Sequence, residues 1–393
     1  MMKYKLLILL GVVATSCQTS KSNLKSNWSV LQEAKSIDCQ KWPFAPGDLE
    51  VLKIQEAELR SGRGFVVSSR DRMGRRVHSY RSFNKGEVSE DEFIRLNWGQ
   101  NSEYLGDILL DGDRFFVIQR ESRTGQQLIE VRDPIKNIVK YSSLNLGRNL
   151  RGQYIRSHES GFWLIYKDLK AGESIEDLPS KILRFSFGKG ERLSHQRVKF
   201  EIGNDHYSST VNSNEIFIMW KERQKKKGTE VFKYAIVGDG KKKISVYNFE
   251  TAKERVESWT LAPHRDGFLM VFVVGDTLIW ENASMEIRIL DQRGEVFWTQ
   301  STPIENKHIG DPLIVAKPTY SFLMVPKWLD GESTLEVHKV VENDLSHIGD
   351  FGVYKEGTYL VKGMGRPKSE NPFILKQYPS GFTKKFSICE IEI

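Results

Sequence analysis

The sequence predicts an all-β protein whose main domain is a seven-bladed β-propeller behind a short N-terminal tether; six or eight blades also fit the pattern. Short runs rich in Val, Ile, Phe, Tyr and Trp alternate with turns of Gly, Asp, Asn and Lys, which is typical of strands. The strongest runs recur about every 50 residues. No long stretch has the periodicity of an amphipathic helix.

The repeat is marked by one apolar position at the start of each strong run. Each run is followed by a charged loop and then by an alternating strand. Neighbouring markers lie 47 to 54 residues apart, at Phe65, Phe115, Phe162, Ile216, Phe268, Phe322 and Phe373. This period fits blades of four strands. A short strand precedes each marker from the second onward, and we expect it to be the innermost strand of its blade.

The last unit is short of strands after Phe373. We expect the segment 48–59, which is rich in alternating apolar residues, to pair with that unit and close the ring. Closure of this kind removes the open sheet edge between the first and last blades.

The first sixteen residues predict a secretory signal. Lys3 and Lys5 precede an apolar run from Leu6 to Val13, and small residues then lead to Cys17. The run is too short to span a bilayer of about 30 Å as a helix. We therefore expect residues 1–16 to be removed on export.

The end of this signal resembles the lipobox of bacterial lipoproteins, although Ala14 stands where that family more often has Leu. The resemblance implies cleavage before Cys17 and acylation of Cys17. From the polar composition of the following segment and the repeat after it, we expect a lipid-anchored tether over residues 17–38 and the propeller over 39–393. Gln18 follows the cysteine, and by the sorting rule of enteric bacteria this implies the outer membrane, facing the periplasm or the cell surface.

Two further cysteines lie near the two ends of the exported chain, at Cys39 and Cys389. One interpretation is that both are buried, unpaired thiols. The other is a disulfide, which an exported protein can keep and which would close a loop of 350 residues. We expect the disulfide, because a closed ring brings the two ends together.

The net charge argues against a dedicated nucleic-acid binder. It is +7 for the whole chain and +5 without Lys3 and Lys5, which is mild for this length. Outside the cytoplasm, basic residues more plausibly meet anionic headgroups or polysaccharides.

Basic residues gather in the loops that follow the marker strands of the first four units. In a propeller these loops share one face, which would form a site for an anion or a protein partner. The alternative is that they are solvated hairpin tips, diluted by neighbouring acids such as Asp71 and Glu121. The candidate residues are Arg70, Arg72, Arg75, Arg120, Arg123, Lys167, Lys170, Lys221, Arg223, Lys225 and Lys226.

Signatures of catalysis are absent from the sequence, which has no HExxH, CxxC or GxSxG motif. Asp205, His206, His308 and Asp311 are the candidates for a site at the channel mouth of the propeller. They support the alternative that the protein is a glycan lyase or hydrolase. A third interpretation is a subunit of an assembly machine, with an exposed aromatic patch around Trp328. We expect no metal and no cofactor.

One segment, Ile289 to Trp298, resembles the PQQ-like propeller repeat through Asp291 and the spacing from Gly294 to Trp298. Lipoproteins with such repeats include a subunit of the outer-membrane β-barrel assembly machine. The resemblance implies a propeller architecture and an envelope address. The sequence as a whole favours a membrane-anchored binding scaffold rather than an enzyme.

Overall fold

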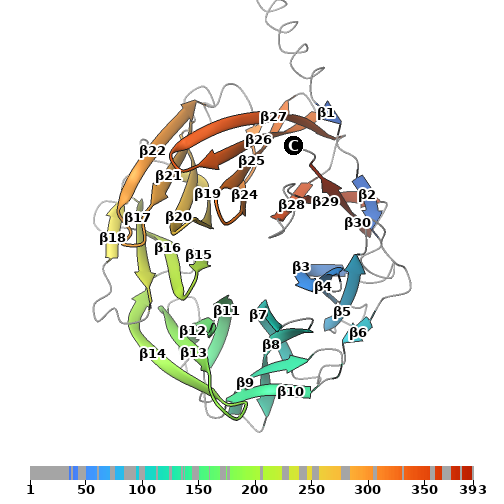
Figure 1. Cartoon of the computed structure of the whole chain (residues 1–393), viewed down its shortest axis with the longest axis vertical. Helices are drawn as coiled ribbons and strands as arrows, with labels where there is room; N and C mark the ends of the chain where they lie inside the picture. The colour runs from blue at the N-terminus through green and yellow to red at the C-terminus, as the bar shows by residue number, and fades with distance from the viewer. Residues whose placement is uncertain are drawn as a thin grey trace, which may run out of the picture.

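The chain forms a ring of β-sheets around a central axis in a computed structural model (Figure 1). The structure describes residues 35–36, 39–42, 50–59, 62–70, 76–83, 94–96, 102–111, 114–123, 126–133, 136, 138–143, 150–158, 160–168, 174, 178–203, 207–223, 230–238, 246–249, 256–275, 284–303, 308–329, 332–354, 359–364, 373–380 and 383–391. Within these ranges every regular element is a strand, and no helix there has the length and apolarity needed to cross a membrane.

The described strands form seven sheets, the number of blades that the repeat predicts. We call the strands of a blade A to D from the channel outward. Blade one consists of β3 (Glu50–Leu59), β4 (Gly62–Arg70), β5 (Arg76–Phe83) and β6 (Ile94–Leu96). Blade two consists of β7 (Ser102–Asp111), β8 (Arg114–Arg123), β9 (Gln126–Asp133) and β10 (Ile138–Ser143). Blade three consists of β11 (Leu150–His158), β12 (Gly161–Asp168), β13 (Ser180–Phe187) and β14 (Leu193–Ile202).

Blades four to seven continue the pattern, with one interrupted A strand. Blade four consists of β15 (Tyr207–Asn212), β16 (Glu215–Arg223), β17 (Glu230–Val237) and β18 (Val246–Phe249), and blade five of β19 (Val256–His264), β20 (Gly267–Val274), β21 (Ser284–Leu290) and β22 (Val296–Pro303). In blade six β23 (His308–Ile309) and β24 (Leu313–Ala316) share the A position, followed by β25 (Ser321–Leu329), β26 (Glu332–Val341) and β27 (Asp344–Tyr354). Blade seven consists of β28 (Tyr359–Met364), β29 (Phe373–Ser380), β30 (Thr383–Glu390) and β2 (Cys39–Trp42). The marker residues therefore all lie in B strands, as predicted.

The ring closes through a different segment from the one predicted. The segment 48–59 contains β3, which pairs with β4 as the A strand of blade one. The short strand β2 instead supplies strand D of blade seven by pairing with β30. The expectation for 48–59 was wrong because this segment precedes the first marker, as every A strand precedes its own marker. A further strand, β1 (Lys35–Ser36), lies in the predicted tether and pairs in parallel with β27 of blade six.

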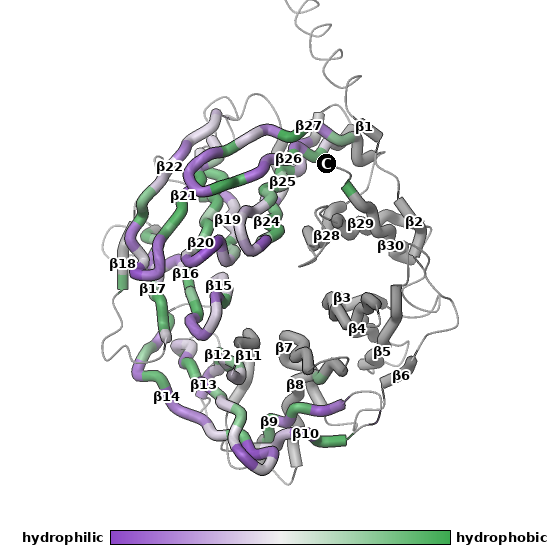
Figure 2. The backbone as a smooth tube through the Cα atoms, in the orientation of Figure 1, coloured by the Kyte–Doolittle hydropathy of each residue, from purple (hydrophilic) through white to green (hydrophobic). Residues whose placement is uncertain are grey.

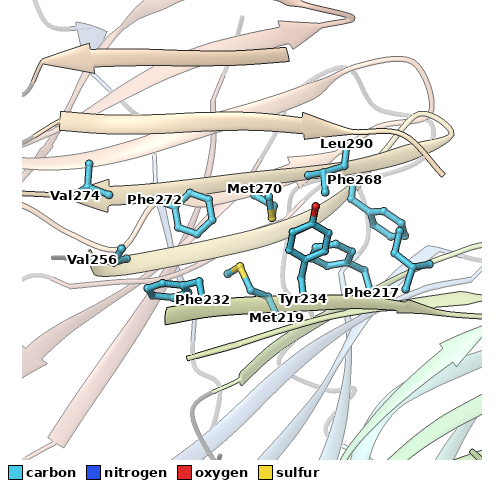
Figure 3. Packing of buried hydrophobic residues seen from close by; sticks show 11 residues of the cluster. Phe217, Met219, Phe232, Tyr234, Val256, Phe268, Met270, Phe272, Val274 and Leu290 are labelled. Carbon is cyan, nitrogen blue, oxygen red and sulfur yellow. The ribbon is translucent and has the colours of Figure 1, made fainter. Parts of the chain in front are cut away.

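The hydrophobic core lies between neighbouring blades. Every residue of β20 is buried, because blades cover both faces of this B strand, whereas the outer strand β22 has no buried residue. Figure 2 shows hydrophobic residues mainly in the inner strands, with β14 largely hydrophilic. Between blades four and five, Met270 and Phe272 face Met219 and Phe232 (Figure 3). Burying a side chain of this size stabilises the fold by about 1.5–3 kcal/mol.

Two glycines explain why Gly-Phe recurs at the start of a B strand. A Cβ atom at Gly161 would lie 1.9 Å from the carbonyl oxygen of Phe185, and one at Gly267 would lie 1.9 Å from that of Leu290. In both blades strand C crosses too closely for any side chain. The glycine is therefore a requirement of blade packing.

Polar contacts between A–B turns hold successive blades in place. Asn212 of blade four donates from Nδ2 to the carbonyl oxygens of Arg265 and Gly267, each at 2.9 Å. His264 Nδ1 lies 2.9 Å from Ser321 Oγ of blade six. These contacts tie blade four to blade five and blade five to blade six.

Candidate functional site

The predicted basic face is defined by the C-terminal ends of the B strands. Equivalent strands run in the same direction in every blade, so the B–C hairpins lie on one face of the ring. Arg70, Arg123 and Arg223 end β4, β8 and β16. Arg70 is the register partner of Arg76 across its hairpin. The fold thus places an arginine at the hairpin end of blades one, two and four.

Two lysines expected on this face have described side chains, and both lie against the blades. Lys167 is fully buried, with 0% of its surface exposed, so its assignment to an exposed loop was wrong. It lies inside β12, one residue before the strand ends, where neighbouring blades enclose it. Lys221 is half-buried, and its Nζ lies 5.9 Å from the ring centroid of Phe232.

The other basic candidates lie wholly or partly outside the described part of the chain. Only the backbone is described for Arg70, Arg120, Arg123 and Arg223. The residues outside the described ranges are Arg72, Arg75, Lys170, Lys225 and Lys226, together with Cys17.

The predicted channel-mouth site is not assembled by the residues that the structure describes. Asp205 and His206 fall outside the described ranges. His308 lies in β23 as the register partner of Trp328, and Asp311 is exposed in the link between β23 and β24. Of these four residues only Asp311 has a described side chain, so the channel-mouth site stays a prediction.

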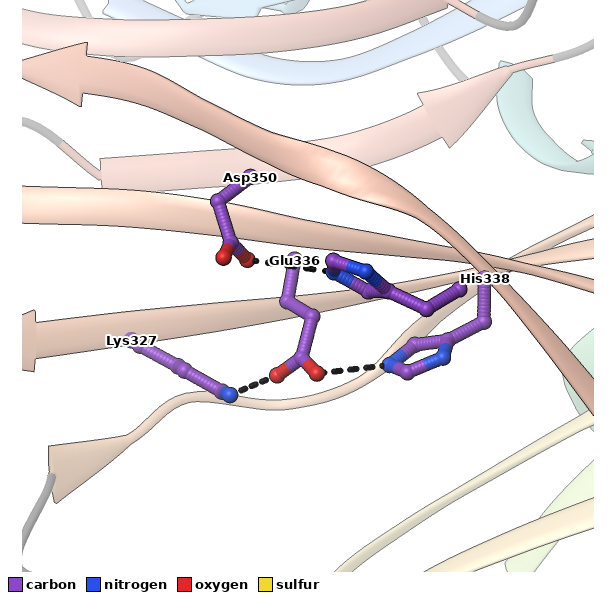
Figure 4. A network of polar contacts seen from close by, with 5 residues as sticks. Lys327, Glu336, His338 and Asp350 are labelled. Atoms are coloured by element: carbon purple, nitrogen blue, oxygen red, sulfur yellow. Dashed lines mark ion pairs between the residues drawn. The ribbon is translucent and has the colours of Figure 1, made fainter. Parts of the chain in front are cut away.

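A different polar cluster lies on blade six, at its interface with blade five. It consists of Lys327 from β25, Glu336 and His338 from β26, and His347 and Asp350 from β27 (Figure 4). On the same face, Leu323, Val325 and Val340 pack against apolar residues of blade five. We call these five polar residues the blade-six cluster.

A β-bulge creates the blade-six cluster. Glu336 is the register partner of Asp350, and His338 is the register partner of His347. Glu336 and His338 are two positions apart in β26, whereas His347 and Asp350 are three positions apart in β27. The shift between Val337 and His338 accommodates the extra residue. Without the bulge, His347 and Asp350 would point to opposite faces of β27, since side chains alternate along a strand.

The contacts in the cluster are short. His338 Nε2 lies 3.0 Å from Glu336 Oε1, and His347 Nε2 lies 3.5 Å from Asp350 Oδ1. Lys327 Nζ pairs with the other carboxylate oxygen of Glu336. One ligand atom from each of Glu336, His347 and Asp350 falls within 4.8 Å of the other two.

His338 is buried, and its ring nitrogens lack hydrogen bonds. Only 6% of its surface is exposed, and neither ring nitrogen has a hydrogen-bond partner. The 3.0 Å approach to Glu336 is short, but it is not aligned as a hydrogen bond. Burial, followed by the charges of His347 and Lys327, lowers the pKa of His338 to about 4, and Asp350 acts in the opposite direction. His338 is therefore a neutral imidazole at pH 7.

Strand C also carries an ion pair in two other blades. Glu130 pairs with Arg132 in β9 at 2.8 Å, and Glu286 pairs with Arg288 in β21. In each case an acid and a base two residues apart lie on one face of strand C. Blade six has His338 where the other two blades have arginine. The sequence carries this signal as IEVR, MEIR and LEVH, but His338 and His347 were not among the candidate residues predicted from the sequence.

Neither a protein-family model nor a characterised protein sequence matches the chain. The β-propeller domain of the Trilobed protease from Pyrococcus furiosus matches with a TM-score of 0.51 at 12% identity, over 88% of this chain and 94% of that one. One of two prolyl endopeptidases matches with a TM-score of 0.51 at 11% identity, over 96% of this chain and 51% of that one. The fold is a β-propeller.

This likeness shows the fold and no activity. Propellers carry many unrelated functions, and the chain spans only about half the length of the prolyl endopeptidase. Function must therefore be argued from the faces and clusters of this chain.

Proposed function

We propose that the protein is an exported, lipid-anchored scaffold that binds an anionic partner of the cell envelope on the B–C face of its propeller. The N-terminal signal and Cys17 support the address. The basic loops support the choice of face.

The observation that carries the proposal is the recurrence of arginine at one place in the fold. Arg70, Arg123 and Arg223 end the B strands of three blades, and loops rich in lysine or arginine follow two of them. Positive charge on one face attracts anions more strongly than a mean charge of this size implies. Such an interaction is screened by salt, with a Debye length of about 10 Å at 0.1 M.

Charge reversal tests the proposal. The full chain, solubilised in detergent, is assayed for binding to dextran sulfate, with neutral dextran as the probe that lacks the charge. We expect the triple variant Arg70→Glu, Arg123→Glu and Arg223→Glu to weaken binding about tenfold or more and to reduce its salt dependence.

A matched control reverses charge on the opposite face. Lys189 and Arg192 are exposed near the C–D turn of blade three, so Lys189→Glu with Arg192→Glu is expected to leave binding nearly unchanged. Equal loss in both variants would mean that only net charge matters. Binding that is indifferent to the triple variant would reject this face as the docking surface.

A further inference from the structure

We propose that the blade-six cluster is a binding site for a divalent transition-metal ion of the zinc class, with Glu336, His338, His347 and Asp350 as ligands. The four residues come from two adjacent strands, β26 and β27, and the bulge between Val337 and His338 places them on one face. Lys327 is a neighbour of the site and not a ligand.

The donor set has the composition that zinc prefers. Zinc is bound by imidazole nitrogens and carboxylate oxygens at about 2.0–2.2 Å, usually with four ligands in a tetrahedron. Ligand atoms in such a tetrahedron are about 3.3 Å apart. His338 Nε2 and Glu336 Oε1 are already 3.0 Å apart, and the atoms of Glu336, His347 and Asp350 lie within 4.8 Å of one another. His338 is not within that distance of all three of the others, so the proposal requires rotation of His347, which is exposed, and of Asp350, which is half-buried.

The second observation is His338 itself. It is more than nine-tenths buried, and both of its ring nitrogens are without a hydrogen-bond partner. A buried polar atom in that state costs free energy unless something else satisfies it. A metal ion between Nε2 and the carboxylate of Glu336 would satisfy Nε2 and Oε1, and a neutral imidazole is the form that binds metals.

The third observation is the departure of blade six from its own repeat. Blades two and five place an arginine beside the glutamate, and the two residues form an ion pair. Histidine in place of arginine removes a permanent cation and introduces a metal ligand. Blade six also adds His347 and Asp350 opposite this pair, which a two-residue ion pair does not need.

Lys327 competes with the metal for the carboxylate of Glu336. Its ammonium pairs with Glu336 Oε2, whereas Oε1 faces His338. With a metal on Oε1, the ammonium of Lys327 would hold the other carboxylate oxygen and so orient the ligand, as hydrogen-bond partners of metal ligands commonly do. Its positive charge would also repel the ion. Removal of this charge should therefore tighten metal binding, the opposite of what a plain ion-pair network predicts.

Titration of the full chain with Zn²⁺ tests the site. The protein is kept in detergent, carries no polyhistidine tag and is first stripped with EDTA; Co²⁺ serves as a spectroscopic probe of tetrahedral coordination. We expect a 1:1 complex, with Mg²⁺ unable to compete because it prefers octahedral oxygen ligands. His347→Ala and Asp350→Asn should each weaken binding about 100-fold or more, since loss of a ligand costs at least as much as loss of a second-shell partner.

Two further variants complete the design. His195→Ala removes an exposed histidine of blade three and should leave the affinity unchanged, whereas Lys327→Gln should tighten binding about tenfold. Because His347 is exposed, its variant is expected to fold, and far-UV circular dichroism checks this; Asp350→Asn provides an independent test. Absence of zinc binding by the unmodified protein would overturn the proposal, as would binding that neither His347→Ala nor Asp350→Asn weakens.

Discussion

Cys39 and Cys389 are direct register partners in the antiparallel pair of β2 and β30. These strands come from the two ends of the chain, and their pairing completes blade seven. Cα atoms that are directly opposite in such a pair are about 4.5–5.5 Å apart. A disulfide spans about 4.4–6.8 Å, so the backbone holds the two cysteines at a separation that permits the bond.

We predict that the exported protein contains a Cys39–Cys389 disulfide. Mass spectrometry of a non-reduced digest should show a peptide that joins the two residues. Cys39→Ala should lower the free energy of unfolding by up to about 6 kcal/mol, because the bond would restrict a long loop in the unfolded chain. Two free thiols in protein isolated under non-reducing conditions would contradict this prediction.

Replacement of Cys17 should change the location of the protein without changing its stability. If Cys17 carries the lipid, Cys17→Ala removes the acyl chains that make anchoring stable. The variant should move from the membrane fraction to the soluble fraction, while its melting temperature in detergent stays the same. A membrane pool of undiminished size would refute the anchor.

Acidification should destabilise the blade-six cluster. The pKa of His338 is about 4 in the folded protein against 6.5 for an unperturbed histidine, so between these values the unfolded state binds more protons. Stability therefore falls as the pH drops from about 6.5 to 4, by up to about 3 kcal/mol from this residue. The groups that face it are Lys327, Glu336, His347 and Asp350.

Chemical denaturation with EDTA present measures this effect. His338→Gln should lose less stability than the unmodified protein over that pH interval, whereas His195→Gln should lose as much. Parallel losses in all three proteins would show that His338 does not titrate as described.

Gly267→Ala should destabilise the contact between strands B and C of blade five. The added Cβ would meet the carbonyl oxygen of Leu290 at 1.9 Å, and moving backbone to relieve such a clash costs about 1–3 kcal/mol. Gly349→Ala is the control, because its Cβ would meet only the Phe351 side chain, at 3.7 Å. Thermal denaturation compares the two; equal melting temperatures would mean that the strand can shift freely.

Most of the blades were predictable because they are local structures. In six of the seven described sheets the strands of the blade follow one another along the chain and pair as hairpins, so the apolar B strand and the turns around it repeat in the sequence. Blade seven is the exception, because its D strand is β2. Phe162 and Phe268 mark their strands for this reason, and Gly161 and Gly267 precede them because strand C passes so close. Lys167 shows the limit of this approach, since its charge suggested a loop, although neighbouring blades bury it.

The sequence by itself determined the all-β class, the period of the repeat and the presence of two cysteines near the ends of the chain; the export signal that it indicates stays a prediction. Only the tertiary structure decided that β2 and not β3 closes the ring, because the partner of β2 lies 350 residues away and no local pattern encodes that pairing. It also decided that Glu336, His338, His347 and Asp350 converge. One inserted residue in a bulge determines which face of β27 its side chains occupy, and composition does not reveal such a shift in register.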